Sequence, residues 1–245
     1  QIIQNWGLVA FPTETVYGLG ANALDETAVK KIFEAKWRPA DNPLIVHIWE
    51  KSDIEKYAKN IPPLAYTLIE KFWPGALTIV LEKKDIIPFA TTAGLSTVCL
   101  RMPSHPLALR LIEATWVPLA APSANTSGRP SPTSSEHVFD DMDGKIDAIL
   151  EWDIPEIGIE STVLDLTVSP PVILRHGWIT EEMLLEFTSL WDISEWTGVK
   201  SPGMKYRHYA PNVELLIASH TDIPEILARI ERGENIGFMG VGTTG

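Results

Sequence analysis

Two threonines follow an apolar stretch near the start of the sequence and form its first candidate site. Residues 8–11 read Leu-Val-Ala-Phe, and Pro12 leads into Thr13, Glu14 and Thr15. In an extended segment the side chains of Thr13 and Thr15 point to the same side. They could therefore bind a small polar ligand together, or they could donate hydrogen bonds to the nearby backbone of a turn. The local pattern leaves both readings open.

A second candidate site is the basic pair Lys36 and Arg38. Pro39 disfavours helical geometry for Arg38, so an expected helix should end here and the two side chains can converge. A lysine point charge and a forked guanidinium beside Asn42 are suited to binding phosphate. The alternative is a solvated helix C-terminus, where the helix dipole favours basic residues in any case.

Further polar residues stand where expected strands end. The loop 121–133 follows an apolar strand and is rich in hydroxyls and small residues, which let backbone N–H groups approach a ligand. Arg101 also ends an apolar run, where a structural ion pair is the alternative to a ligand contact. The other polar residues at strand ends are His47, Glu160, Ser161, Thr162 and Arg175.

The elements that must position these groups form an α/β pattern, because short apolar runs alternate with helical periodicity. Strands are expected at 8–11, 44–48, 77–81, 97–100, 146–150, 162–166 and 172–174. Helices are expected to begin after Asp25, Ser52, Pro63, Pro106, Ser134 and Thr180.

The composition changes near residue 190. An irregular stretch is followed by an expected strand at 213–217, a helix at 223–231 and a strand at 235–239. We therefore expect a catalytic domain over 1–190, a linker or lid over 191–212, and the start of a second α/β domain over 213–245. We also expect the chain to be part of a longer protein.

The composition narrows the classes of function. The chain has 245 residues and a net charge of −12, so it lacks the basic footprint for nucleic-acid binding over its whole surface. Cys99, the single cysteine, is expected to be a buried small residue in a reducing, cytoplasmic compartment. No apolar run reaches the ~18 residues of a membrane span. The sequence has no glycine-rich phosphate loop and no zinc-ligand spacing, so we expect no metal-binding residues.

Taken together and in order, the motifs closely resemble the YrdC-like threonylcarbamoyl-AMP synthases, in the long form with an extra C-terminal domain. The resemblance covers about residues 5–212. Its motifs are 12–20 (PTETVYGLG), 36–47 (KWRPADNPLIVH), 72–78 (FWPGALT), 101–106 (RMPSHP), 121–125 (APSAN), 158–163 (GIESTV) and 201–211 (SPGMKYRHYAP).

The resemblance implies a fold and an activity. The fold would be a three-layer α/β domain (α+β in some schemes) with a large twisted mixed sheet and a deep concave site. The activity would be synthesis of L-threonylcarbamoyladenylate and pyrophosphate from L-threonine, bicarbonate and ATP, with Mg²⁺ on the nucleotide. The product would feed the threonylcarbamoyl-transferase machinery that modifies tRNA. We expect a monomer without a membrane partner.

The resemblance also implies roles for individual residues. The catalytic positions are Lys36, Arg38, Ser123 and Asn125. The positions that bind ATP are Arg38, Asn42, Thr97, Ser123, Ser131, Arg175, His208 and Tyr209. The positions that bind threonine are Thr15, His47, Arg101, Ala121 and Ser161.

The segment 201–211 is expected to be a lid over the nucleotide. Lys205 and Arg207 add positive charge to a stretch with no acidic residue, within an acidic protein. Tyr206, His208 and Tyr209 add flat faces and hydrogen-bonding groups. The alternative is a tether whose basic residues pair with acids of the first domain.

Some positions depart from the family pattern. Four tryptophans stand where the family commonly has small residues, often glycine: Trp6, Trp37, Trp116 and Trp178. If position 37 requires a positive φ, a tryptophan there would be strained. Two other readings of the chain stay open, a carbamoyl-transferring maturation domain and an RNA-binding module of the same fold.

Overall fold

The structure is a computed structural model that describes residues 1–152, 154–191 and 223–232. The chain divides into two compact units, 1–210 and 211–245. In the first unit the strands are β1 (Val9–Phe11), β2 (Gly18–Asn22), β3 (Ile45–His47), β4 (Ala58–Lys59), β5 (Leu77–Lys83), β6 (Thr97–Arg101), β7 (Leu119–Ala120), β8 (Ala148–Ile149), β9 (Thr162–Asp165) and β10 (Val172–Arg175).

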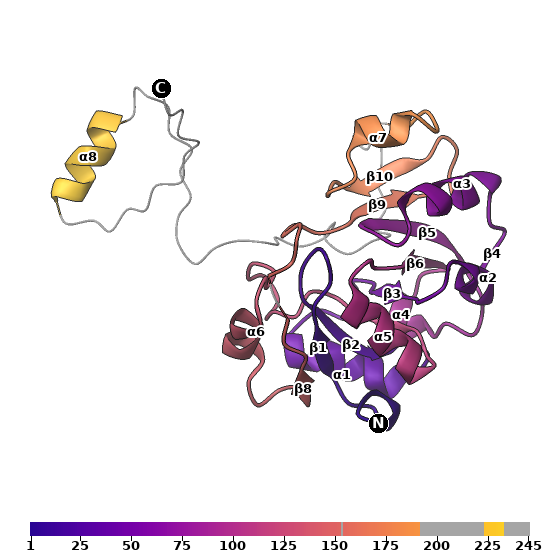
Figure 1. Cartoon of the computed structure of the whole chain (residues 1–245), viewed down its shortest axis with the longest axis horizontal. Helices are drawn as coiled ribbons and strands as arrows, with labels where there is room; N and C mark the ends of the chain where they lie inside the picture. Colours follow the sequence, from indigo (N-terminus) through magenta and orange to yellow (C-terminus); the bar gives the residue numbers. More distant parts are fainter. Residues whose placement is uncertain (153, 192–222, 233–245) are drawn as a thin grey trace. The chain divides into compact units, whose positions relative to one another are not determined.

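Helices connect most of these strands (Figure 1). The α-helices of the first unit are α1 (Glu26–Lys36), α2 (Ile54–Tyr57), α3 (Pro63–Phe72), α4 (Phe89–Thr92), α5 (Pro106–Thr115), α6 (Ser135–Met142) and α7 (Glu181–Leu185). Two short 3₁₀ helices cover Ile3–Asn5 and Lys51–Asp53. The described part of the second unit holds α8 (Ile223–Glu231).

The strands form one large mixed sheet, as the sequence resemblance implies. Its order is β10-β9-β5-β6-β3-β7-β2-β1-β8, and β4 pairs with β5 beside this path. The pairs β3/β6, β5/β9 and β1/β8 are parallel, and the other pairs are antiparallel. The parallel pairing of β3 with β6 places His47 opposite Arg101, so two candidate site residues meet at the same ends of neighbouring strands.

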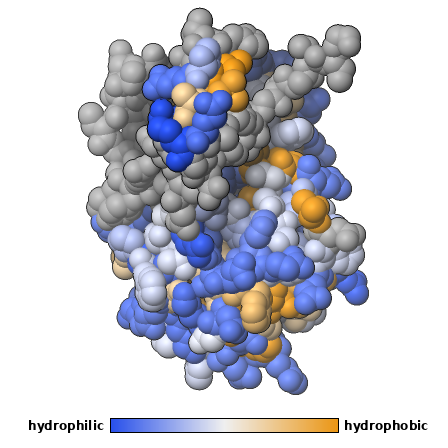
Figure 2. Space-filling view, turned by 90° about the vertical axis from the view of Figure 1, so that its left-hand side faces the viewer, coloured by the Kyte–Doolittle hydropathy of each residue, from blue (hydrophilic) through white to orange (hydrophobic). Residues whose placement is uncertain are grey.

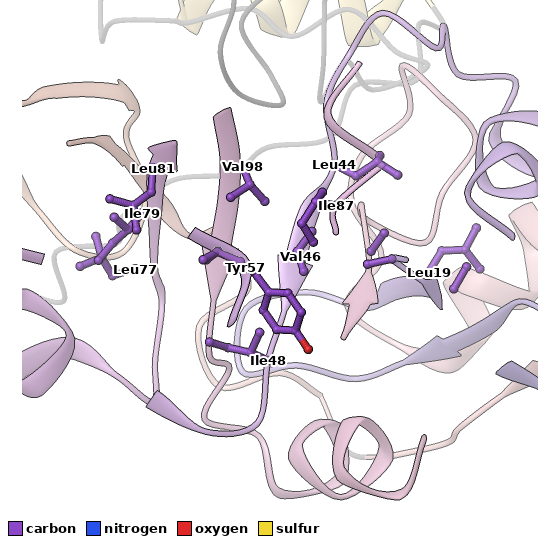
Figure 3. Packing of buried hydrophobic residues seen from close by; sticks show 14 of the residues in the cluster. Leu19, Leu44, Val46, Ile48, Tyr57, Leu77, Ile79, Leu81, Ile87 and Val98 are labelled. Carbon is purple, nitrogen blue, oxygen red and sulfur yellow. The ribbon is translucent and has the colours of Figure 1, made fainter. Parts of the chain in front are cut away.

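Both faces of the sheet are buried. Alternate residues of β5, Leu77, Ile79 and Leu81, belong to the main apolar core, and Figure 3 shows them side by side along the strand. Val80 points to the opposite face and packs in a separate apolar cluster with Cys99. A strand alternates its side chains between faces, so a strand buried on both reads as a continuous apolar run.

Helices cover each face. Ala28, Val29 and Ile32 of α1 pack in the main core, and α5 packs Ala108 and Ile112 on the cluster that contains Phe11 of β1. Helix caps fix where several helices begin: the side chains of Asp25, Ser134 and Thr180 accept backbone N–H groups of α1, α6 and α7. Sheet and helices together give the layered α/β architecture expected from the sequence.

Most expected elements are present, with shifted ends. The expected strand at 146–150 shortens to β8, and the helix after Ser52 starts as a 3₁₀ turn before α2. The sequence analysis missed β2, β4 and the short α4, and it gave no bounds for β7, the apolar strand that it expected before the loop 121–133. The expected strands at 213–217 and 235–239 and most of the linker 191–212 lie outside the described residues.

The face drawn in Figure 2 is mainly polar. In Figure 2 hydrophilic residues cover most of the described face, and apolar residues gather in smaller areas. Among the described residues, no helix combines the length and apolar character needed to cross a bilayer.

Candidate active site

A cavity opens where the ends of several strands meet. Together with the open space at its mouth it spans about 700 Å³. The turn after β1, the end of α1, the ends of β3 and β6, the loop after β7, and the segments beside β9 and β10 all contribute to its wall.

The two threonines of the first motif both line the cavity and take different tasks. Their hydroxyl oxygens lie 2.9 Å apart. The Thr13 hydroxyl donates to the carbonyl of Val16 (2.6 Å) and accepts from the backbone N–H of Thr15 and of Val16, so Thr13 closes a local turn. The Thr15 hydroxyl accepts from Nη2 of Arg101 at 3.1 Å. The turn reading is thus confirmed for Thr13, and ligand binding by Thr15 stays a prediction.

Arg101 combines a structural ion pair with a place in the cavity wall. Its Nη2 lies 2.6 Å from Oε1 of Glu14, and each side chain is only 5% exposed. Its Nε donates to the carbonyl of Gly75. Bonds on two sides hold the guanidinium in one orientation, which preorganises it for a ligand.

Lys36 is buried and holds the loop after β7. The residue is 1% exposed, and its Nζ donates to the carbonyl of Ser123 and, at 2.5 Å, to that of Asn125. Burial and the nearby Arg38 guanidinium lower the pKa of the Lys36 amine well below its ordinary value. The end of α1 is therefore not a solvated helix terminus.

Arg38 is also buried, and the turn at Trp37 explains how it reaches the same cavity. Trp37 adopts a left-handed conformation, with φ 50° and ψ 38°. This turn ends the helix, so Lys36 and Arg38 both line the cavity. Nη2 of Arg38 donates to the carbonyl of Pro43 at 3.2 Å.

The loop after β7 is held from the other side by α6. The backbone N–H of Thr126 donates to Oδ2 of Asp141 at 3.0 Å, and Arg129 forms an ion pair with Oδ1 of the same carboxylate. The Asn125 side-chain amide donates to the carbonyls of Thr126 (2.9 Å) and Arg129 (2.8 Å). These contacts give the loop a defined shape.

The far wall is built by the start of β9 and the end of β10. The Ser161 hydroxyl lies 2.8 Å from that of Thr78 and accepts from Nη2 of Arg175 at 3.0 Å. Arg175 also donates to the Ser161 carbonyl from Nε (3.0 Å) and Nη2 (2.8 Å). Next to it, the Ser131 hydroxyl donates to Oε1 of Glu160 at 2.5 Å.

His47 contributes a neutral imidazole. Burial, helped by the Arg101 charge, lowers its pKa to about 3. Its Nδ1 is buried and has no hydrogen-bond partner among the described residues. The ring can therefore accept or donate a hydrogen bond without adding charge.

The charges around the cavity are strongly biased. Basic side chains dominate its described wall: Lys36, Arg38, Arg101, Arg129 and Arg175. Glu160 is the only acidic residue among the described lining residues. Ion pairs with Glu14 and Asp141 offset the charges of Arg101 and Arg129. The other basic side chains of the wall still favour an anionic ligand, in spite of the net charge of −12 for the whole chain.

Most residues predicted to form the site do line this cavity. They are Thr15, Lys36, Arg38, His47, Arg101, Ala121, Ser123, Asn125, Ser161 and Arg175. The structure brings them together; their contacts with ligands stay predictions.

Three predicted residues stand apart from the described wall: Asn42, Thr97 and Ser131. Thr97 begins β6 and Arg101 ends it, which separates them by about 13 Å along the strand. Ser131 reaches the wall through its hydrogen bond to Glu160. His208, Tyr209 and the rest of the expected lid 201–211 lie outside the described residues.

Sequence reasoning assigned no role to two charged lining residues. Arg129 lies in the polar loop that was singled out as a whole, and Glu160 was noted only as a polar group at a strand end. Their position in the sequence could have pointed to them, because each lies within four positions of Asn125 or Ser161, which were predicted to belong to the site.

Comparisons with known proteins agree with the resemblance. The family model described as Telomere recombination (Sua5/YciO/YrdC) matches residues 1–177, and the model described as Threonylcarbamoyl-AMP synthase, C-terminal domain, matches residues 179–244. The threonylcarbamoyl-AMP synthase of Pyrococcus abyssi is 51% identical over 98% of this chain and 75% of its own length. The protein of that name from Bacillus subtilis is 52% identical over 86% of this chain, which spans 62% of the bacterial protein.

A solved structure is similar over the whole chain. The crystal structure of P. abyssi Sua5 complexed with L-threonine superposes with a TM-score of 0.92 at 49% identity. The match covers 100% of this chain and 76% of that one.

Proposed function

Because this chain belongs to the Sua5/YciO/YrdC family of threonylcarbamoyl-AMP synthases, we propose that it makes L-threonylcarbamoyladenylate and pyrophosphate from L-threonine, bicarbonate and ATP. The observation that carries the proposal is the cavity at the strand ends, in which basic side chains and the residues of the sequence motifs come together. The synthase names of the relatives favour this function over the carbamoyl-transfer and RNA-binding alternatives.

The chemistry needs positive charge in one place. The threonine amine forms a carbamate with bicarbonate, and the carbamate oxygen then attacks the α-phosphorus of ATP. An anion must thus approach a polyanion, and fixed basic groups reduce their repulsion. Positioning and charge account for most of the catalysis in phosphoryl-type transfers. We expect Mg²⁺ to be carried by the nucleotide phosphates.

We propose that the cavity has a nucleotide side and a threonine side. Lys36 fixes the Ser123–Asn125 loop through two backbone carbonyls, so its first task is to shape the nucleotide side. Arg38 and Arg175 would contact the phosphates. Thr15 and Arg101, which are joined by a hydrogen bond, would contact threonine. The P. abyssi relative was crystallised with that amino acid.

Other expectations belong to the same proposal. The link to tRNA threonylcarbamoylation, the cytoplasmic location and the contacts of His208 and Tyr209 with ATP rest on family membership and on sequence. Cys99 is buried, and burial raises the pKa of its thiol to about 12, which fits the expectation of a small packing residue.

Pyrophosphate release tests the proposal directly. The full chain should release pyrophosphate from ATP when both L-threonine and bicarbonate are present. Omission of either substrate should reduce release to background. Equal pyrophosphate release without threonine would refute the proposed synthase activity.

A further inference from the structure

Glu160 stands out because it is the only acidic residue among the described lining residues of a basic cavity. The nucleotide phosphates and the substrate carboxylate are anions, and the basic side chains suit them. The α-amino group of threonine arrives as a cation. Near several guanidinium groups it needs an acceptor that offsets their repulsion.

The backbone around Glu160 is held in place. The N–H of Trp178 donates to the Glu160 carbonyl at 3.3 Å. A Cβ at Gly177 would come within 2.3 Å of that same carbonyl oxygen, so the close approach of the two segments requires glycine there. A carboxylate on such a fixed support is preorganised for a ligand.

The side chain of Glu160 lies between the two proposed halves of the site. Its Oε1 accepts from Ser131, a position expected to bind ATP, and the next residue, Ser161, is expected to bind threonine. Glu160 is partly exposed, so the carboxylate is accessible from the cavity. The amine that becomes the carbamate must lie near this border, because the carbamate then attacks the nucleotide.

On the proposed function, we propose that Glu160 binds the α-ammonium group of threonine and accepts its proton. The ammonium N–H bond breaks, and its proton moves to a Glu160 oxygen. The freed lone pair attacks the carbon of bicarbonate, a C–N bond forms and water leaves with the second amine proton. Ammonium, bicarbonate and carboxylate thus give carbamate, water and protonated Glu160, with charge and atoms balanced.

Glu14 and His47 are the other acceptors to weigh. Oε2 of Glu14 is buried without a described partner, but its carboxylate charge is already offset by Arg101. The His47 imidazole is neutral and its Nδ1 is without a described partner. A neutral ring beside Arg101 offers no charge to offset an ammonium group. His47 is better suited to a hydroxyl, which leaves the ammonium to Glu160.

The test compares Glu160→Gln with Glu156→Gln, an exposed glutamate of the same segment that loses the same charge. Calorimetry on the full chain should show that Glu160→Gln weakens L-threonine binding about tenfold. Binding of (R)-3-hydroxybutyrate, which lacks the amine, should stay within about threefold. Glu156→Gln should leave both affinities unchanged.

Kinetics supply the second readout. Pyrophosphate release by Glu160→Gln should fall roughly hundredfold at neutral pH, recover in part in Glu160→Asp, and rise relative to wild type as the pH approaches the pKa of free threonine. The inference is overturned if Glu160→Gln behaves like Glu156→Gln. It is also overturned if Glu160→Gln weakens the binding of L-threonine and of (R)-3-hydroxybutyrate equally, or if a higher Mg²⁺ concentration alone restores its pyrophosphate release. Threonine-independent release by the wild type would instead refute the proposed function, and the binding comparison would still test Glu160.

Discussion

Three tryptophans occupy a backbone conformation that L-residues avoid, and replacing one of them with glycine should stabilise the protein. Trp6, Trp37 and Trp116 have φ values of 61°, 50° and 59°. Each caps the C-terminal end of a helix. Glycine is favoured at that place because it has no Cβ to clash with the backbone.

Trp116 offers the clearest measurement. It is 77% exposed, so its ring buries little surface whose loss would offset the change. A left-handed L-residue costs roughly 1–2 kcal/mol, and the greater flexibility of glycine in the unfolded chain costs roughly 0.5–1 kcal/mol. Trp116→Gly should therefore raise the free energy of unfolding by about 1 kcal/mol. For a chain of this size that raises Tm by about 2–4 °C.

The other two sites should gain less, because their rings have partners. Nζ of Lys145 lies 4.7 Å from the Trp37 ring centroid, a contact worth about 0.5–1 kcal/mol. The indole N–H of Trp6 donates to Asp25 at 2.9 Å. Each partner offsets most of the relief of strain.

Urea unfolding of the full chain with matched variants checks this reasoning. Trp116→Ala removes the same ring and keeps a Cβ at positive φ, so it should give no gain. Trp178→Gly, at an exposed tryptophan whose φ is not positive, should lose about 0.5–1 kcal/mol. Equal stability of the alanine and glycine variants at position 116 would refute the backbone argument.

Two further changes probe the buried groups of the site. Lys36→Met should lower pyrophosphate release at least tenfold, because it leaves the carbonyls of Ser123 and Asn125 without their donor. Lys30→Met, on the exposed face of α1, is the control and should leave the release unchanged. A similar loss of release in both variants would show that Lys36 does not act by holding the loop. For His47, the folded pKa of about 3 lies below the unfolded value, so the unfolded chain binds a proton that the folded chain does not, and stability falls as the pH drops below about 6.5. Between pH 7 and pH 5, the free energy of unfolding in urea should fall by about 2 kcal/mol less in His47→Asn than in the wild type. The exposed His137→Asn is the control and should lose as much as the wild type. If His47→Asn also loses as much as the wild type, His47 is charged in the folded protein.

The fold could be predicted where periodicity is strong. The caps and proline signals located α1, α3, α5 and α6, and the apolar runs located β5, β6 and β9. β2 was missed because its sequence, Gly-Leu-Gly-Ala-Asn, has one large apolar residue among small ones, and its neighbours explain why. A Cβ at Gly20 would come within 2.8 Å of the Phe11 ring, so close packing replaces the usual strand composition.

The site could be predicted as a set of segments and less well as a set of roles. Strand ends and loop composition pointed to the right stretches, because function gathers where strands end. The sequence could not show that Glu14 pairs with Arg101 or that Lys36 bonds to backbone carbonyls. Those contacts join positions about ninety residues apart, and only the sheet topology brings them together.

The turn at Trp37 connects the strain to the site. On a continuous helix Lys36 and Arg38 would point about 200° apart, since each residue turns the helix by about 100°. The left-handed turn between them breaks the helix and brings both side chains to one cavity wall. The conformation at position 37 is thus required by the geometry of the basic pair, whichever residue adopts it. At position 116 the same conformation ends α5 and positions no lining side chain. Strain at 37 therefore accompanies the arrangement of the site, while strain at 116 can be removed without touching it.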